Sequence, residues 1–180
     1  METLTETSRW KTMNIFVLDT DPVIAAQYHC DQHINKMILE SAQILSSAAR
    51  KWVAYAHLNL FYKPLQLSHP CVMWAMDDLN NCKWLARLAL SLADERLCRF
   101  PNLAPHNSTV IVINFINHTP LENYTPPAKF ALAMPERIRY AQNLTDVEKY
   151  RRYYTVKQLL WAAKGKTMTW TNRLEPEFMK

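Results

Sequence analysis

The chain of 180 residues contains a single glycine, Gly165. A Walker loop, a dinucleotide-binding fingerprint and the nucleophile elbow of a serine hydrolase each need several glycines at fixed spacing. P-loop nucleotide hydrolysis and hydride transfer on a Rossmann fold are therefore excluded. Tight hairpin turns also favour glycine, so the scarcity of this residue indicates a mainly helical protein.

Further absences narrow the class of protein. No apolar run is long enough to span a bilayer, so we expect no contact with a membrane. Residues 1–12 lack the apolar centre of a signal peptide, so we expect a cytoplasmic protein. The four cysteines are scattered without Cys-x-x-Cys spacing, which is typical of reduced thiols rather than of a zinc site. We accordingly predict no metal and no cofactor.

The residues that are present predict a mainly α fold. Hydrophobic residues make up 49% of the chain, enough for the core of one domain. Periodicity and capping residues predict three long helices, over 22–50, 68–99 and 145–164. The second would have Ser68 or His69 as its cap and Pro70 as an early residue, and the third begins with the capping box Thr145-Asp-Val-Glu148. At most one or two short strands are expected. Residues 13–18 are predicted to be a strand or an extended segment, and residues 109–116 to be either a buried helix or a strand. We expect residues 1–12 to be a loosely packed extension and 13–180 to form a single helical domain.

The first predicted helix begins with Asp21 as N-cap and Pro22 as first residue. At about 100° per residue, four polar residues fall within an arc of roughly 60°: His29, His33, Lys36 and Glu40. A desolvated lysine in such a stripe attacks carbon or holds a phosphate, while an imidazole or carboxylate moves protons. The two histidines also have metal-ligand spacing, but a lysine on the same face opposes a cation.

Asp31 lies on the apolar face of this helix and is a further candidate carboxylate. The alternative interpretation is that the polar stripe is a solvated helix face and that Asp31 caps a neighbouring element. We therefore take His33, Lys36, Glu40 and Asp31 as candidate catalytic residues and His29 as a candidate binding residue.

Two further groups of residues are candidates for binding a nucleic acid. On the second predicted helix, His69, Trp74 and Asn81 could form a base-reading pocket. The alternative is that Trp74 packs in the core and Asn81 bridges two helices. The segment from Lys129 to Lys180 is basic and rich in aromatic residues, a composition that suits phosphates and exposed bases. Its candidates are Arg151, Tyr154, Lys157, Trp170 and Arg173. The alternative is that these tyrosines pack in the core and the cations are solvated.

Four motifs in order resemble a family of small uncharacterised proteins of large DNA phages and viruses: MNIFVLDTDP, AAQYHCDQHINKMILESAQIL, SHPCVMWAMDDLNNCKWLARL, and EKYRRYY with a later Trp-x-x-Arg-x-x-Pro. The resemblance covers about Met13 to Lys180 and implies a protein of the host cytoplasm. More distantly, the layout resembles the phage pyrimidine-dimer DNA glycosylases of the endonuclease V type. That likeness implies a glycosylase-like helical layout with His33 and Lys36 beside the site.

The resemblance implies an enzyme that acts on a pyrimidine base in DNA. The glycosylases use a free N-terminal amine, whereas 12 residues precede Met13 here, and no acid stands at their catalytic carboxylate position, nearest Asn35 or Lys36. Group transfer onto a hydroxymethyl-type pyrimidine, with a small amine or amino acid as co-substrate, fits these residues better than excision. Two alternatives stay open: a non-catalytic nucleic-acid-binding protein, and a small helical enzyme acting on a free nucleotide or other phosphorylated metabolite.

Overall fold

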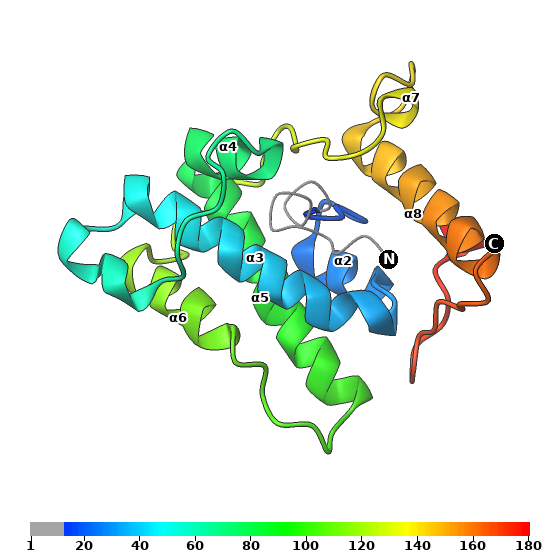
Figure 1. Ribbon diagram of the computed structural model, residues 1–180, viewed down its shortest axis with the longest axis horizontal. Helices are drawn as coiled ribbons and strands as arrows, with labels where there is room; N and C mark the ends of the chain where they lie inside the picture. The colour runs from blue at the N-terminus through cyan, green and yellow to red at the C-terminus, as the bar shows by residue number, and fades with distance from the viewer. Residues whose placement is uncertain (1–12) are drawn as a thin grey trace, which may run out of the picture.

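Two long helices, α3 (Asp31–Trp52) and α5 (Leu79–Arg99), pack against each other at the centre of the molecule (Figure 1). The computed structural model describes residues 13–180, which are mainly helical and contain no strand. Around the central pair lie α2 (Pro22–Tyr28), α4 (Pro70–Asp77) and α6 (Thr109–His118). Further along the chain are α7 (Glu136–Arg139) and α8 (Asp146–Ala162), with short 3-10 helices η2 (Tyr55–Leu60) and η3 (Glu177–Met179). The predicted mainly α fold is confirmed.

The prediction of one continuous helix over 22–50 is wrong, because the chain forms two helices there, α2 and α3. His29 and Cys30 have extended backbones, with ψ of 136° and 160°, and separate α2 from α3. The Cys30 amide is held by a tertiary partner, since its N–H donates to the Tyr154 hydroxyl at 3.0 Å. A hydrogen bond to a residue so distant in sequence leaves no local signal, so the apolar periodicity runs on through the break.

The predicted helix over 68–99 also divides in two. His69 caps α4 and Pro70 opens it, as predicted, but Asp78 is extended at φ −138° and ψ 136°. The Asp78 carboxylate accepts a hydrogen bond from the Asn80 N–H at 2.8 Å and so starts α5 as a new helix.

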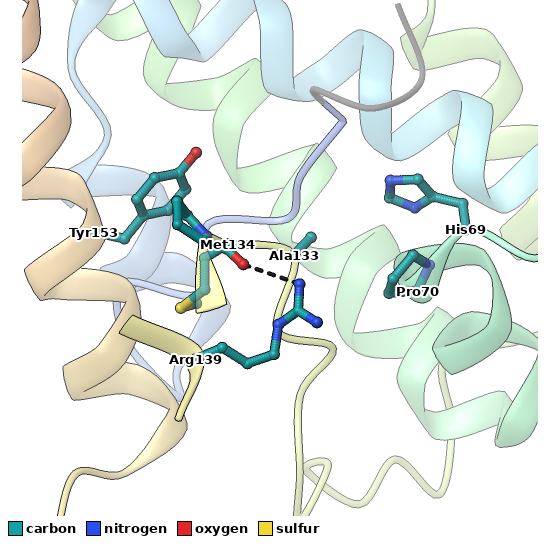
Figure 2. A pocket seen from close by; sticks show the side chains of 7 residues that line it. His69, Pro70, Ala133, Met134, Arg139 and Tyr153 are labelled. Carbon is teal, nitrogen blue, oxygen red and sulfur yellow. Dashed lines mark hydrogen bonds between the residues drawn. The ribbon is translucent and has the colours of Figure 1, made fainter. Parts of the chain in front are cut away.

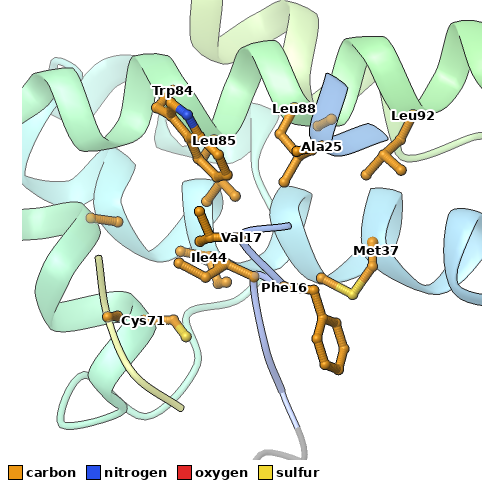
Figure 3. Packing of buried hydrophobic residues seen from close by; sticks show 14 of the residues in the cluster. Phe16, Val17, Ala25, Met37, Ile44, Cys71, Trp84, Leu85, Leu88 and Leu92 are labelled. Atoms are coloured by element: carbon orange, nitrogen blue, oxygen red, sulfur yellow. The ribbon is translucent and has the colours of Figure 1, made fainter. Parts of the chain in front are cut away.

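Residues 13–18 form an extended segment, the second of the two predicted alternatives, and not a strand. The side chains of Phe16, Val17 and Leu18 are fully buried, and Figure 3 shows Phe16 and Val17 among core side chains of α3 and α5. The Asn14 side-chain oxygen accepts hydrogen bonds from the amides of Ile15 and Phe16, which satisfies backbone groups that have no strand partner. The ambiguous stretch from Thr109 is a helix, α6. The expectation for residues 1–12 lies outside the described residues.

Helix α8 begins with the predicted capping box. The Thr145 hydroxyl accepts from the Glu148 N–H, and the Glu148 carboxylate accepts from the Thr145 N–H. After α8 the chain turns at Gly165, whose φ is +69°, and the tail runs back onto the body (Figure 1). There the Trp170 indole N–H donates to the Tyr28 carbonyl at 3.0 Å. The tail therefore packs on the domain.

We expect Gly165→Ala to lower the free energy of unfolding by about 1 kcal/mol, because the left-handed backbone is costly for a residue with a Cβ. No atom lies within 4 Å of the added Cβ, so the cost is one of backbone conformation alone. Urea unfolding measures it. Gly165→Asn should cost less, since asparagine tolerates this region, and equal losses in the two variants would contradict the explanation.

Candidate functional site

The candidate site lies where α3 meets α8 and the extended segment 13–18. On α3 the Lys36 ammonium pairs with the Glu40 carboxylate at 3.3 Å. The other Glu40 oxygen accepts from the backbone N–H of Asn14 at 3.0 Å. His33 is 1% exposed and Glu40 8%, so the interpretation of a solvated helix face is wrong for these two residues. We refer to His33, Lys36, Glu40 and Lys157 as the His33–Lys157 cluster.

His33 is fixed by one hydrogen bond and by aromatic rings. Its Nδ1 lies 2.7 Å from the Tyr154 hydroxyl, and its ring stacks on Phe16 with centroids 4.9 Å apart. The indole of Trp161 lies 5.1 Å away. Burial lowers the pKa of His33 well below its ordinary value, and the charges of nearby basic residues, Lys36 and Lys157 among them, add to the shift. The imidazole is therefore neutral near pH 7.

Lys157 reaches the same place from α8. Its ammonium lies 5.4 Å from the Phe16 ring centroid and 5.1 Å from that of Tyr153. Burial lowers the pKa of Lys157, and the charge of Lys36 adds to the shift while Glu40 opposes it. Burial also raises the pKa of Glu40, against the pull of Lys36. A lysine with a lowered pKa beside a carboxyl with a raised one suits proton transfer and nucleophilic attack.

A cavity of about 340 Å³ is lined by Tyr153, whose ring also faces the Lys157 ammonium of this cluster. His69 and Pro70 at the start of α4 lie across it from Tyr153 of α8, and Arg139 and Met134 lie between them (Figure 2). The Arg139 guanidinium donates to the Met134 carbonyl at 3.0 Å. Because the Tyr153 ring centroid lies 5.1 Å from the Lys157 ammonium and 5.8 Å from that of Phe16, this one side chain links the cavity to the cluster. The cavity falls in the size range of small-molecule pockets and offers a cation and aromatic surface to a ligand.

Asp31 takes part in a structural network instead. Its carboxylate pairs with Arg99 at 3.0 Å and accepts from the amide and hydroxyl of Thr171. Arg99, whose side chain is fully buried, also donates to Glu95 and to the carbonyl of His29. These partners tie α2, α3, α5 and the tail together, as the alternative interpretation of Asp31 expects.

His29 does not share the stripe, because it lies in the break before α3. It is fully buried, and its Nδ1 donates to the Ala25 carbonyl at 2.7 Å. Its Nε2 has no hydrogen-bond partner among residues 13–180. The stripe predicted from the sequence is therefore reduced to His33, Lys36 and Glu40.

The remaining predicted binding residues are mostly engaged within the protein. Trp74 donates to the Lys129 carbonyl at 2.9 Å and Asn81 to the Trp74 carbonyl at 2.7 Å, as the bridging alternative describes. Both line another cavity, of about 400 Å³. Arg151 binds the Leu18 carbonyl and Asp19, and Arg173 binds Glu95 at 2.6 Å. Only His69, Tyr154 and Lys157 of that set lie at the candidate site.

Several residues of the site were not predicted. Phe16, Tyr153 and Arg139 come from segments that are far apart in sequence. Phe16 has a positive φ of 32°, a costly conformation for a bulky residue that the surrounding structure must hold in place. The sequence contains no signal for that backbone angle, whereas the basic, tyrosine-rich run 149–157 could have indicated Tyr153.

Burial of His29 predicts a loss of stability in acid. Burial lowers the pKa of His29 to about 4, with the charge of Arg99 acting in the same direction. Neutral His29 contributes fully to the free energy of unfolding above about pH 6.5, the pKa of histidine in the unfolded chain. This contribution is lost as the pH falls towards 4, because the unfolded chain takes up the proton first. The loss should reach about 3 kcal/mol.

Urea unfolding at several pH values tests this expectation. His29→Gln should flatten the pH dependence of the free energy of unfolding between about pH 6.5 and 4.5. The dependence that remains comes from His33, whose pKa is also lowered in the folded protein. A variant with the same acid profile as the wild type would contradict it. Glu40 acts with the opposite sign at and above the ordinary glutamate value of 4.5, since burial raises its pKa in the folded state.

No protein-family model matches the chain, and no match was found among curated proteins or solved structures. The resemblance to phage proteins therefore stays a prediction. In residues 13–180 no three His, Cys, Asp or Glu side chains come together as metal ligands would. Within the same residues, no helix combines the length and the apolar character needed to cross a membrane.

Proposed function

We propose that the protein is an enzyme acting on a pyrimidine base in DNA, by group transfer onto a hydroxymethyl-type carbon or by base excision. The observation that carries this proposal is the position of Lys157. Its ammonium stands over the rings of Phe16 and Tyr153 and within electrostatic reach of the Lys36–Glu40 pair. The Tyr153 ring in turn lines the cavity. An accessible ring for a base, cations for a phosphate and groups with shifted pKa values suit such chemistry. Tyr153 offers that ring to the cavity, because Phe16 is fully buried.

In group transfer an incoming amine forms a C–N bond as the C–O bond to a leaving pyrophosphate breaks. Neutral His33 or a deprotonated lysine of the cluster takes the proton of the amine. Lys36 and Arg139 supply the positive charge that a leaving pyrophosphate needs. In excision a lysine amine would instead attack the sugar carbon as the base departs, and the Glu40 carboxyl would supply a proton.

Exposed cations near the site support a DNA substrate. Five exposed lysine and arginine residues have no ion-pair partner among residues 13–180 and lie on or beside α7 and α8: Lys129, Arg137, Arg152, Lys164 and Lys166. Such charges hold the phosphate backbone without reading sequence. Arg151, Trp170 and Arg173 are used within the fold, so in either hypothesis, an enzyme or a non-catalytic binding protein, the exposed cations hold the DNA.

Mass spectrometry of nucleosides from treated DNA tests the proposal. The templates carry thymine, 5-hydroxymethyluracil or its pyrophosphorylated form, each with and without amines and amino acids. A mass shift on one nucleoside is the result expected for group transfer and identifies the donor. Loss of the base or strand cleavage is the result expected for excision.

Unchanged nucleosides on every template would overturn the proposal. Salt-sensitive DNA binding without a product would then favour a binding protein. Thermal stabilisation by mononucleotides but not by oligonucleotides would favour an enzyme of free nucleotides.

A further inference from the structure

A second cavity, of about 540 Å³, lies between the start of α2, the middle of α5 and the loop that follows α6. It shares no residue with the cavity beside the His33–Lys157 cluster. Its apolar lining comes from three elements: Val23 of α2, Leu90 of α5, and Leu121 and Pro126 of the loop. The nature of its polar lining indicates what it binds.

Two polar atoms of this lining are buried without a hydrogen-bond partner among residues 13–180, the Arg87 Nε and the Tyr124 hydroxyl. The Arg87 guanidinium lies over the Tyr124 ring, 4.5 Å from its centroid, and one of its NH groups donates to the Leu121 carbonyl at 3.3 Å. Burial raises the pKa of Tyr124 to about 12, so the hydroxyl keeps its proton. Buried donors of this kind are costly unless a ligand or water accepts from them.

An opposite charge faces the same cavity. Asp21 lines it and lies close enough to Tyr124 to influence its pKa, as Arg87 does. One Asp21 oxygen accepts from the amides of Val23 and Ile24, and its other oxygen has no partner among residues 13–180. The lining therefore offers a cation, a phenol donor and a carboxylate around an apolar space.

We propose that this cavity binds a small zwitterion, an α-amino acid with an apolar side chain. The ligand carboxylate accepts from Arg87 and Tyr124, the ammonium group faces Asp21, and the side chain packs on Val23, Leu90 and Leu121. Binding here is measured without DNA, so the inference does not rest on the proposed function.

Calorimetric titration of the full chain with L-leucine tests this assignment. Two probes separate the charges: 4-methylpentanoate has the carboxylate without the ammonium group, and 3-methylbutylamine has an amine without the carboxylate. We expect leucine to bind more tightly than either. Arg87→Gln should weaken leucine binding about tenfold or more and Tyr124→Phe about threefold to tenfold, because each removes a donor to the carboxylate.

Arg152→Gln is the matched control, because Arg152 is exposed on α8 outside the cavity, and it should bind leucine as the wild type does. Tyr124→Phe keeps the ring under Arg87, so its result stands even where Arg87→Gln unfolds. Absence of leucine binding, or equal binding by wild type and Tyr124→Phe, would overturn the assignment. Equal affinity for leucine and 4-methylpentanoate would contradict the role of Asp21.

Discussion

Replacement of Arg99 by methionine is expected to lower the free energy of unfolding by about 3–5 kcal/mol. The Arg99 side chain is fully buried, and it pairs with Asp31 at 3.0 Å and with Glu95 at 3.1 Å. It also donates to the carbonyls of Gln27 and His29, each at 2.9 Å. Methionine fills a similar length but leaves two mostly buried carboxylates and two carbonyls without this partner, and an uncompensated buried charge is among the costliest defects.

Urea unfolding at neutral pH measures this loss. Arg152→Met is the control, since Arg152 is exposed on α8, and its effect should stay within about 0.5 kcal/mol. If Arg99→Met cost no more than Arg152→Met, the network would not hold α2, α3, α5 and the tail together. Although burial opposes it, hydrogen bonds from Arg99 and Thr171 keep the pKa of Asp31 below its ordinary value, which is consistent with a charged pair.

Replacement of Lys157 by methionine is expected to lower turnover about 10²–10⁴-fold on whichever DNA template reacts, the range of a lost acid–base group. Methionine keeps the packing of the lysine stem on Phe16 and Tyr153 but removes the amine. His33→Gln should fall in the same range, because it removes the neutral imidazole that faces Tyr154. Single-turnover rates at saturating DNA measure both effects.

Lys166→Met is the matched control for these variants. Lys166 is exposed beyond the end of α8, so its loss should weaken DNA binding and reduce the salt dependence while leaving turnover unchanged. Lys157→Met should keep the wild-type unfolding midpoint within a few degrees. Full turnover in both Lys157→Met and His33→Gln would remove the cluster from the reaction.

Local signals predicted the helical content and several helix ends. Asp21–Pro22, His69–Pro70 and the Thr145 capping box each start a helix where expected, because capping involves residues within one turn. The breaks at Cys30 and Asp78 were missed. At Cys30 the amide is held by Tyr154, a contact between distant segments that periodicity does not reveal.

The candidate site was predicted only in part, because some of its residues lie close together in sequence and others come from distant segments. His33, Lys36 and Glu40 share one helix face, so their spacing alone places them together. Lys157 and Tyr154 were identified as candidate binding residues, but nothing in their own segment shows that α8 packs against α3 at His33. Phe16, which joins both helices through its ring, depends on a strained backbone that only the folded chain imposes.

The central claim is that His33, Lys36, Glu40 and Lys157 form one electrostatically coupled site. An NMR titration of the Lys157 side chain tests it most directly, in the wild type and in Lys36→Met and Glu40→Gln. The account predicts a pKa below the ordinary lysine value in the wild type, a rise in Lys36→Met and a further fall in Glu40→Gln. A Lys157 that titrates as an ordinary surface lysine and ignores both substitutions would contradict it.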